Sequence, residues 1–338
     1  MSEDKFLLVK GRAGLGNRIL CLLSAILYAR LTGRRLIVDW SDDAYSNDGS
    51  NVFSSLFQCP LTGQMDEIPA TDSVRPGIWR GHLHQSALDM ILLYPEASLR
   101  YPETWRAFSV DLSRLDYPED VLVMWSYVEQ VYIMRRHFKG SYQELSRLST
   151  KAILRSILQK NLKPHSLIQE RVKQFKLKRF NQKTVGVHVR YMDKKARISA
   201  ILGRLETLIR REPNLQIFLA TDNKEIENIF LDRYRNVIST EKWYPSSGKS
   251  MHRNPESPDR LMHGIEALVD LYLLASCDYL ILDESSSFSY VASLITNTPN
   301  SNIFNVQLGH MIPPEVRHQI WSLKIRLQWS LRKLGLAK

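Results

Sequence analysis

Polar residues that could bind an anion follow an apolar segment in the second half of the sequence. Residues 184–190, TVGVHVR, have the composition of a buried strand that carries His188 and ends at Arg190, and Asp193 follows shortly after. A guanidinium at a strand end can bind a diphosphate through two hydrogen bonds and neutralise the charge that grows on it as it leaves. A surface ion pair of Arg190 with Asp193 or Asp222 is the alternative, and position alone leaves both open.

A second candidate anion site lies at residues 283–295, DESSSFSYVASLI. A predicted strand ends here, and three serines precede an apolar helix. The hydroxyls of Ser285 and Ser286, with the free backbone N–H groups of the helix, would suit a phosphate. An ordinary serine N-cap is the simpler reading of either serine alone. Two such features at strand ends of one domain favour an anion site more strongly than either does by itself.

Asp270 stands in an otherwise apolar helix, GIEALVDLYLLAS at 264–276. A buried carboxylate is costly unless a hydrogen-bond donor or a cation meets it. Guanine offers two donors, N1–H and N2–H, so Asp270 is a candidate for recognising that base. An ion pair with a buried arginine would satisfy the carboxylate equally well, and the sequence does not decide between them.

The N-terminal segment VKGRAGLGNRIL, residues 9–20, has glycines between a predicted strand and a predicted helix. Gly11 and Gly16 have the spacing of a P-loop, but Asn17 and Arg18 stand where that motif has lysine and serine or threonine. We therefore do not predict a P-loop. A close backbone turn is expected, either purely structural or with Asn17 as a hydrogen-bond donor at the reaction centre.

The apolar pattern predicts an α/β protein of two domains. Strands at 5–10 and 36–39 flank a helix at 17–31, with Gly33 as its C-cap, which is a βαβ unit. The second half alternates strands and helices as doubly wound domains do, so a ligand should lie beyond the carboxyl ends of its strands. We expect two domains. Residues 1–179 form the domain on the acceptor side, and residues 180–338 form the domain that contains the nucleotide site and a basic amphipathic C-terminal helix.

The composition limits the classes of function. The chain has 338 residues and a formal net charge of +11, which favours an anionic partner. Its three cysteines, which lie far apart, form neither a disulfide framework nor a zinc motif. The most apolar segment, 19–31, is short for a membrane span. We expect an intracellular, cytoplasmic protein. Nucleic-acid binding is an alternative supported by the Lys/Arg-rich span 151–183, although aromatic residues are not interleaved with that span as stacking platforms would be.

Several motifs, in their order and spacing, resemble the α1,6-fucosyltransferase family and its O-fucosyltransferase relatives. They are GRAGLGNR (11–18), GVHVRYMDK (186–194), IFLATDN (217–223) and the long segment 264–295. The segment TGRRLIVDW (32–40) is most similar to the rhizobial nodulation members. The resemblance covers about the first 60 residues and the second domain, and is weak over 61–183. It implies a GT-B fold, in which two Rossmann-like domains face each other across a cleft.

The resemblance also implies an activity: inverting, metal-independent transfer of fucose from GDP-fucose to a sugar. No Asp-x-Asp motif, the usual metal-binding pair of metal-dependent glycosyltransferases, occurs in the sequence. We expect no cofactor beyond the GDP-fucose substrate, no nucleic-acid partner, and an oligosaccharide acceptor resembling a chitooligosaccharide. A non-catalytic GDP-sugar-binding relic of the fold is the second alternative.

Matched residue by residue, the resemblance assigns roles to the candidates above. His188 and Asp270 would hold guanine, and Arg190 with Ser285 and Ser286 would hold the diphosphate. Asp222 matches an acidic position after the second strand of the domain. Asn17 would approach the reaction centre from the acceptor side.

The sequence departs from the mammalian members at two positions. Tyr191 stands where they have a second arginine, and Ile198 where they have a catalytic glutamate. The general base is therefore unassigned. Asp193 is the nearest acid, and three acids at the end of a first-domain strand could face it: Asp39, Asp42 and Asp43. Largely electrostatic activation, with late proton removal, is the alternative.

Two further segments remain open. Residues 242–259 form a long polar loop that is either a lid or disordered. The C-terminal segment has an apolar stripe flanked by basic residues, and we expect it to dock on the body of the protein rather than weakly on a membrane surface. The stripe consists of Ile320, Leu323, Leu327, Leu331 and Leu334.

Overall fold

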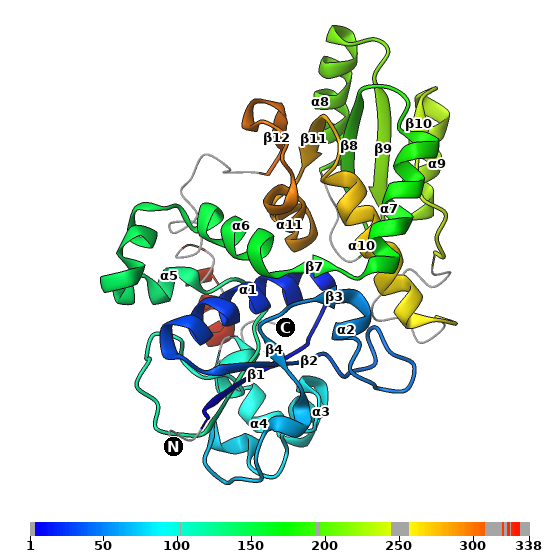
Figure 1. Cartoon of the computed structure of the whole chain (residues 1–338). Coiled ribbons are helices and arrows are strands. Elements are labelled where there is room, and N and C mark those ends of the chain that lie inside the picture. The colour runs from blue at the N-terminus through cyan, green and yellow to red at the C-terminus, as the bar shows by residue number, and fades with distance from the viewer. Residues whose placement is uncertain are drawn as a thin grey trace.

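A computed structural model describes residues 4–101, 103–192, 197–244 and 257–307, and in the C-terminal segment residues 320, 323–324 and 326–331. The molecule has two five-stranded sheets, one in each half, with helices between them (Figure 1). The first sheet is built from residues before 125 and the second from residues after 183. Every neighbouring pair of strands within each of these two sheets is parallel. The predicted α/β class is confirmed.

The first sheet has the strand order β4-β2-β1-β6-β5. Its strands are β1 (Phe6–Lys10), β2 (Arg35–Asp39), β4 (Thr62–Gly63), β5 (Val74–Arg75) and β6 (Val121–Met124). The central strand β1 is buried along its whole length, as the run of apolar residues in its sequence requires of a strand covered on both faces. In the register of β1 and β2, Lys10 lies opposite Asp39.

The helix α1 (Leu15–Thr32) follows β1 and ends at Gly33, which adopts the left-handed conformation predicted for it, with φ of 69°. Among the helices that the structure describes, α1 is long and apolar enough to cross a membrane by length and composition. However, 78% of that segment is buried inside the protein. It starts earlier than the predicted 17–31, and a core helix accounts for its composition.

The second sheet has the order β10-β9-β8-β11-β12 and confirms the predicted alternation. Its strands are β8 (Thr184–Val189), β9 (Gln216–Thr221), β10 (Val237–Ile238), β11 (Tyr279–Leu282) and β12 (Ile303–Asn305). The helices between and after them are α8 (Ile198–Arg211), α9 (Lys224–Arg233), α10 (Arg260–Leu274) and α11 (Ser287–Ile295). The strand order changes direction at β8, so the carboxyl end of β8 is the topological switch point where such sheets bind ligands.

Short elements complete the first half and the connection between the sheets. The helices are α2 (Phe53–Leu56), α3 (Ala87–Leu93), α4 (Pro95–Ser98), α5 (Val131–Met134), α6 (Thr150–Asn161) and α7 (Ser166–Arg179). The 3₁₀ turns are η1 (Met65–Glu67), η2 (Gly77–Trp79), η3 (Thr104–Ala107), η4 (Arg135–His137), η5 (Gly140–Arg147) and η7 (Asn300–Asn302). A two-stranded antiparallel ribbon pairs β3 (Phe57–Gln58) with β7 (Lys163–Pro164).

Helices join the two halves through one apolar cluster that contains residues of both. The helices α1, α6 and α11 pack on one another between the sheets (Figure 1). One core cluster contains Leu20 of α1, Leu268 of α10 and Leu294 of α11. The helix α7 packs on α10, and its Phe175 ring lies 5.9 Å from that of Phe218 in β9. The predicted division into domains at 179/180 stays a prediction.

The described part of the C-terminal segment is helical, and Trp329 Nε1 donates to the backbone oxygen of Leu99 at 3.2 Å. Three residues of the predicted apolar stripe are more than half exposed, namely Ile320, Leu323 and Leu327. This exposure does not support docking of that part of the stripe, whereas Leu331 is half-buried, so docking on the body stays a prediction. Leu334, the last residue of the stripe, lies outside the described residues.

Candidate active site

A cavity lies between the two halves, at the carboxyl ends of β8 and β9 and at the N-termini of α1 and α11. The first half contributes Gly14, Leu15, Gly16 and Tyr45 to its wall. The second half contributes His188, Arg190, Ala220, Thr221, Asp222, Lys242, His263, Glu266, Ala267, Asp270, Ser287 and Phe288. The structure thus brings four of the predicted site residues into one cavity: His188, Arg190, Asp222 and Asp270.

His188 is a buried, neutral ring in the wall of this cavity. Its Nδ1 lies 2.6 Å from Ser289 Oγ, and the ring stacks on Phe288 with centroids 4.8 Å apart. Burial lowers the pKa of His188 to about 3, and the positive charges of Arg190 and Lys242 add to the shift. The ring can therefore act as a hydrogen-bonding and stacking group without carrying charge at neutral pH.

This lowered pKa has a consequence for stability. The unfolded chain binds a proton at His188 as pH falls below about 6.5, whereas the folded chain does not, so the fold loses stability. We expect the wild type to lose about 2 kcal/mol from this group between about pH 7 and pH 5. His188→Asn should have a shallower slope of unfolding free energy against pH, measured by denaturant titration. Equal slopes for the two proteins would contradict the assignment.

Arg190 directly follows β8, is partly buried and lines the cavity. The turn that carries it is fixed by Asp222, whose Oδ1 accepts a hydrogen bond from the backbone N–H of Tyr191 at 2.8 Å. Asp222 therefore helps to position the segment after β8 as well as lining the cavity. Asp193, the nearest candidate for the general base, lies outside the described residues.

The three serines at the start of α11, residues 285–287, differ in their surroundings. Ser285 is exposed, and its backbone N–H donates to Asp283 Oδ1 at 2.9 Å. Ser286 is buried at the N-cap position, and its hydroxyl has no hydrogen-bond partner among the described residues. Ser287, which the sequence did not single out, is the serine that lines the cavity. The predicted pair Ser285 and Ser286 is not among the residues that line the cavity, whereas Ser287, the first residue of α11, is.

Gly16 explains why the loop before α1 is rich in glycine. A Cβ on Gly16 would lie 2.6 Å from the backbone nitrogen of Phe288, so only glycine lets the N-termini of α1 and α11 approach this closely. Next to it, Asn17 Oδ1 accepts from Ser287 Oγ at 3.1 Å, and its Nδ2 donates to the backbone oxygen of Tyr127 at 2.6 Å. Asn17 joins three segments at the cavity, and its role toward an acceptor stays a prediction.

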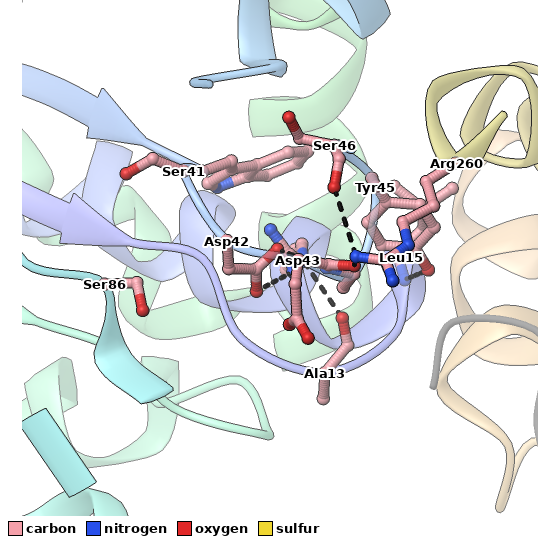
Figure 2. Close-up of polar contacts among 12 residues, drawn as sticks. Ala13, Leu15, Ser41, Asp42, Asp43, Tyr45, Ser46, Ser86 and Arg260 are labelled. Atoms are coloured by element: carbon pink, nitrogen blue, oxygen red, sulfur yellow. Dashed lines mark hydrogen bonds and ion pairs between the residues drawn. The ribbon is translucent and has the colours of Figure 1, made fainter. Parts of the chain in front are cut away.

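Because Gly11 has no side chain, it leaves room for a buried cation, the guanidinium of Arg18, and not for a phosphate. A Cβ added at position 11 would clash with an Nη atom of Arg18. The side chain of Arg18 is buried and forms a 2.5 Å ion pair with Asp42. The guanidinium of Arg18 also lies 5.0 Å from the ring of Tyr45, whose hydroxyl accepts from the N–H of Leu15 at 3.0 Å. These contacts hold the loop that forms the first-half wall of the cavity, and Figure 2 shows Asp42, Tyr45 and Leu15 beside this loop.

The three first-half acids considered as bases have different partners. Asp39 is buried in a 2.5 Å ion pair with Lys10, and Asp42 is committed to Arg18. Asp43 has an exposed side chain, and its backbone oxygen accepts from Arg260 at 2.7 Å (Figure 2). Asp43 is therefore the acid of the three whose carboxylate is open to solvent beside the cavity loop.

Asp270 is buried on α10 and has two partners. Its Oδ1 accepts from Thr240 Oγ1 at 2.6 Å, and its Oδ2 forms an ion pair with Lys242 Nζ. The side chains of Lys242 and Asp270 are 3% and 7% exposed, so the pair is nearly dry. The sequence left open an ion pair with an arginine, but the cation is a lysine from the long polar loop.

Two further groups near Asp270 were not singled out by the sequence. His263 stacks on Trp243 with centroids 4.9 Å apart and is 3.0 Å from Ser257 Oγ through Nδ1. Glu266, one turn before Asp270, has a buried Oε2 without a hydrogen-bond partner among the described residues. Burial raises the pKa of Glu266, and the negative charge of Asp270 adds to this. Both groups line the end of the cavity formed by α10.

Within the described ranges, the structure contains no group of three or more His, Cys, Asp or Glu residues that could hold a metal ion. Cys21, Cys59 and Cys277 are all buried and free. They form no disulfide with one another.

Comparison with known proteins finds the same relatives for the sequence and for the structure. The family described as Nodulation protein Z (NodZ) matches residues 3–64. Nodulation protein Z of Azorhizobium caulinodans is 24% identical over 327 residues, which cover 87% of this chain and 90% of that protein.

Two solved structures cover most of the chain. Fucosyltransferase NodZ from Bradyrhizobium has a TM-score of 0.59 at 22% identity, covering 87% of this chain and 94% of that one. A NodZ alpha-1,6-fucosyltransferase soaked with GDP-fucose has a TM-score of 0.56 at 20% identity, covering 87% and 93%. These matches confirm the resemblance that the motifs indicated, and the predicted GT-B-like fold.

Proposed function

We propose that this chain is a glycosyltransferase that moves fucose from GDP-fucose to a sugar acceptor. The observation that carries the proposal is the cavity between the sheets, which combines Arg190, the N-terminus of α11 and the buried carboxylate of Asp270. The similarity to NodZ, whose structure was determined with GDP-fucose, supports the choice of sugar nucleotide. An oligosaccharide that resembles a chitooligosaccharide is the acceptor we propose.

The residues of the cavity suit the parts of GDP-fucose. Guanine would lie against His188 and Asp270, where a neutral ring and a carboxylate can meet its polar edge. The diphosphate would lie between Arg190 and the first turn of α11, whose backbone N–H groups and positive dipole end attract anions. The hydroxyl of Ser286 at this N-terminus, which has no hydrogen-bond partner in the described part of the chain, offers a further hydrogen bond.

In the proposed reaction an acceptor hydroxyl attacks the anomeric carbon of fucose while its bond to the β-phosphate oxygen breaks. GDP departs with the bonding electron pair, and the configuration at that carbon inverts. Negative charge grows on the leaving phosphate, and Arg190 is preorganised to stabilise it. The acceptor proton leaves late, to solvent or to an acid of the cleft.

The proposed mechanism uses no general base at position 198, where this chain has isoleucine and the mammalian members have glutamate. Ile198 begins α8 and packs on the apolar cluster of the second sheet, so the helix start is used for packing. The candidates for the final proton acceptor are Asp193 and Asp43. Stabilisation of the leaving group therefore carries most of the rate enhancement that we propose.

Transfer should not require a divalent metal ion. The expectation rests on the missing Asp-x-Asp motif, since arginine and helix N–H groups would neutralise the diphosphate instead. Purified protein should transfer labelled fucose at an unchanged rate in EDTA. Loss of transfer in EDTA that manganese or magnesium restores would contradict this.

The proposal is tested by incubating the purified chain with radiolabelled GDP-fucose and a set of chitooligosaccharides. We expect labelled fucose on the oligosaccharide and release of GDP. Binding of GDP-fucose with neither transfer nor GDP release across the acceptor set would identify a non-catalytic relic. Preferential binding of an oligonucleotide over GDP would favour the nucleic-acid alternative.

A further inference from the structure

We infer that Lys242, held in place by its ion pair with Asp270, donates a hydrogen bond to O6 of guanine and so determines the preference of the cavity for GDP. This inference rests on the proposed function, because it concerns how the same cavity selects GDP over other nucleoside diphosphates. The sequence motifs contain Asp270 but not Lys242, which lies in the polar loop before α10.

The geometry makes the two side chains one unit. Lys242 Nζ and Asp270 Oδ2 are in direct ion-pair contact, and Thr240 Oγ1 holds the other carboxylate oxygen at 2.6 Å. Both charged side chains are more than nine-tenths buried, and both line the cavity. A buried pair that lines a cavity presents a fixed pattern of donor and acceptor atoms to whatever fills it.

That pattern matches guanine. The ammonium of Lys242 offers hydrogen-bond donors, and the carboxylate of Asp270 offers acceptors with lone pairs beyond those already used. Guanine presents the acceptor O6 beside the donors N1–H and N2–H, so Lys242 would meet O6 and Asp270 would meet the two N–H groups. Adenine presents an amino donor in place of O6 and an acceptor at N1, so both contacts would be mismatched.

The position of Lys242 favours the base over the phosphates. Asp270 ties its ammonium to α10, whereas the groups suited to a diphosphate lie at Arg190 and at the first turn of α11. The end of the cavity around the pair also contains the stacked rings of Trp243 and His263 and the carboxylate of Glu266. A second carboxylate near the pair suits N–H donors and disfavours a phosphate.

The test is Lys242→Met, which removes the ammonium and keeps most of the side-chain volume. Affinities for GDP, IDP and ADP are measured by calorimetry. IDP keeps O6 and N1–H but lacks the N2 amino group. We expect Lys242→Met to lower the affinities for GDP and IDP by the same factor, roughly 10- to 100-fold for a lost charged hydrogen bond. The affinity for ADP should not change.

Asp270→Asn provides the complementary measurement. It should weaken GDP more than IDP, because N2–H is present only in GDP. Lys224→Met is the matched charge control: Lys224 and Lys242 both lie over the ring of Tyr244, at 5.5 and 5.8 Å, but Lys224 is mostly exposed and does not line the cavity. We expect it to bind all three nucleotides as the wild type does.

Melting curves accompany every variant, since removing Lys242 alone leaves a buried carboxylate unpaired. If Lys242→Met does not fold, the double variant Lys242→Met/Asp270→Asn removes both charges and should fold but lose the preference for GDP over ADP. Equal weakening of GDP and ADP by Lys242→Met would mean that the lysine acts on the diphosphate and would overturn the inference. So would unchanged GDP affinity, or a double variant that still prefers GDP. A wild type that transfers no fucose would instead overturn the proposed function.

Discussion

Replacing Arg190 with alanine should reduce kcat for fucose transfer by on the order of 10²-fold or more, the usual effect of losing a preorganised charge partner of the transition state. Charge on the leaving β-phosphate grows as the fucosyl bond breaks, so Arg190 should act on turnover more than on binding of the ground state. Its side chain lines the cavity rather than the apolar core, so the melting temperature should change little.

Arg190→Lys is the informative companion variant. It keeps the charge but not the planar fork of a guanidinium, so it should restore little of the activity. The measurement is steady-state transfer of labelled fucose, with a melting curve for each protein. An alanine variant that melts normally and turns over near the wild-type rate would remove Arg190 from the mechanism.

Gly16→Ala should reduce kcat/KM by on the order of 10²-fold, although the substitution adds one methyl group and touches no charged residue. The new Cβ would lie 2.6 Å from the backbone of Ser287 and of Phe288, and backbone cannot move aside as a side-chain end can. The N-termini of α1 and α11 would have to separate, and both line the cavity. A loss of stability of about 1–3 kcal/mol should accompany the change.

Gly203→Ala provides the control for Gly16→Ala. Gly203 is exposed within α8, and a Cβ there would meet nothing within 4 Å. Alanine should therefore stabilise the helix by up to about 1 kcal/mol and leave transfer unchanged. Normal activity of Gly16→Ala would show that the close approach of α1 and α11 is not needed for the site.

The sequence was sufficient to predict which polar residues lie together at the carboxyl edge of the second sheet. The apolar pattern locates the end of each strand, and the parallel topology places those ends at one edge. In a parallel sheet the carboxyl ends of neighbouring strands share one edge, so Arg190 after β8 and Asp222 after β9 had to lie near each other. Gly33 was also predictable, because a left-handed residue at a helix end favours glycine.

The ion-pair partners of the buried acids could not be predicted in this way. Lys242 lies in a polar segment without periodicity, and its pairing with Asp270 depends on how residues 240–242 pack against α10. Likewise, Asp39 ends β2 and Asp42 follows it closely, yet they form ion pairs with different buried cations, Lys10 of β1 and Arg18 of α1. Such pairs depend on packing between segments distant in sequence, for which a single sequence has no local signal.

The most direct test of the account is a crystal structure of this chain with GDP. The account predicts the nucleotide in the cavity between the sheets, with the guanine edge on Asp270 and Lys242. The β-phosphate should contact Arg190 and the first turn of α11. A nucleotide bound outside this cavity, or bound in it with the phosphates at α10 and the base at Arg190, would contradict the account.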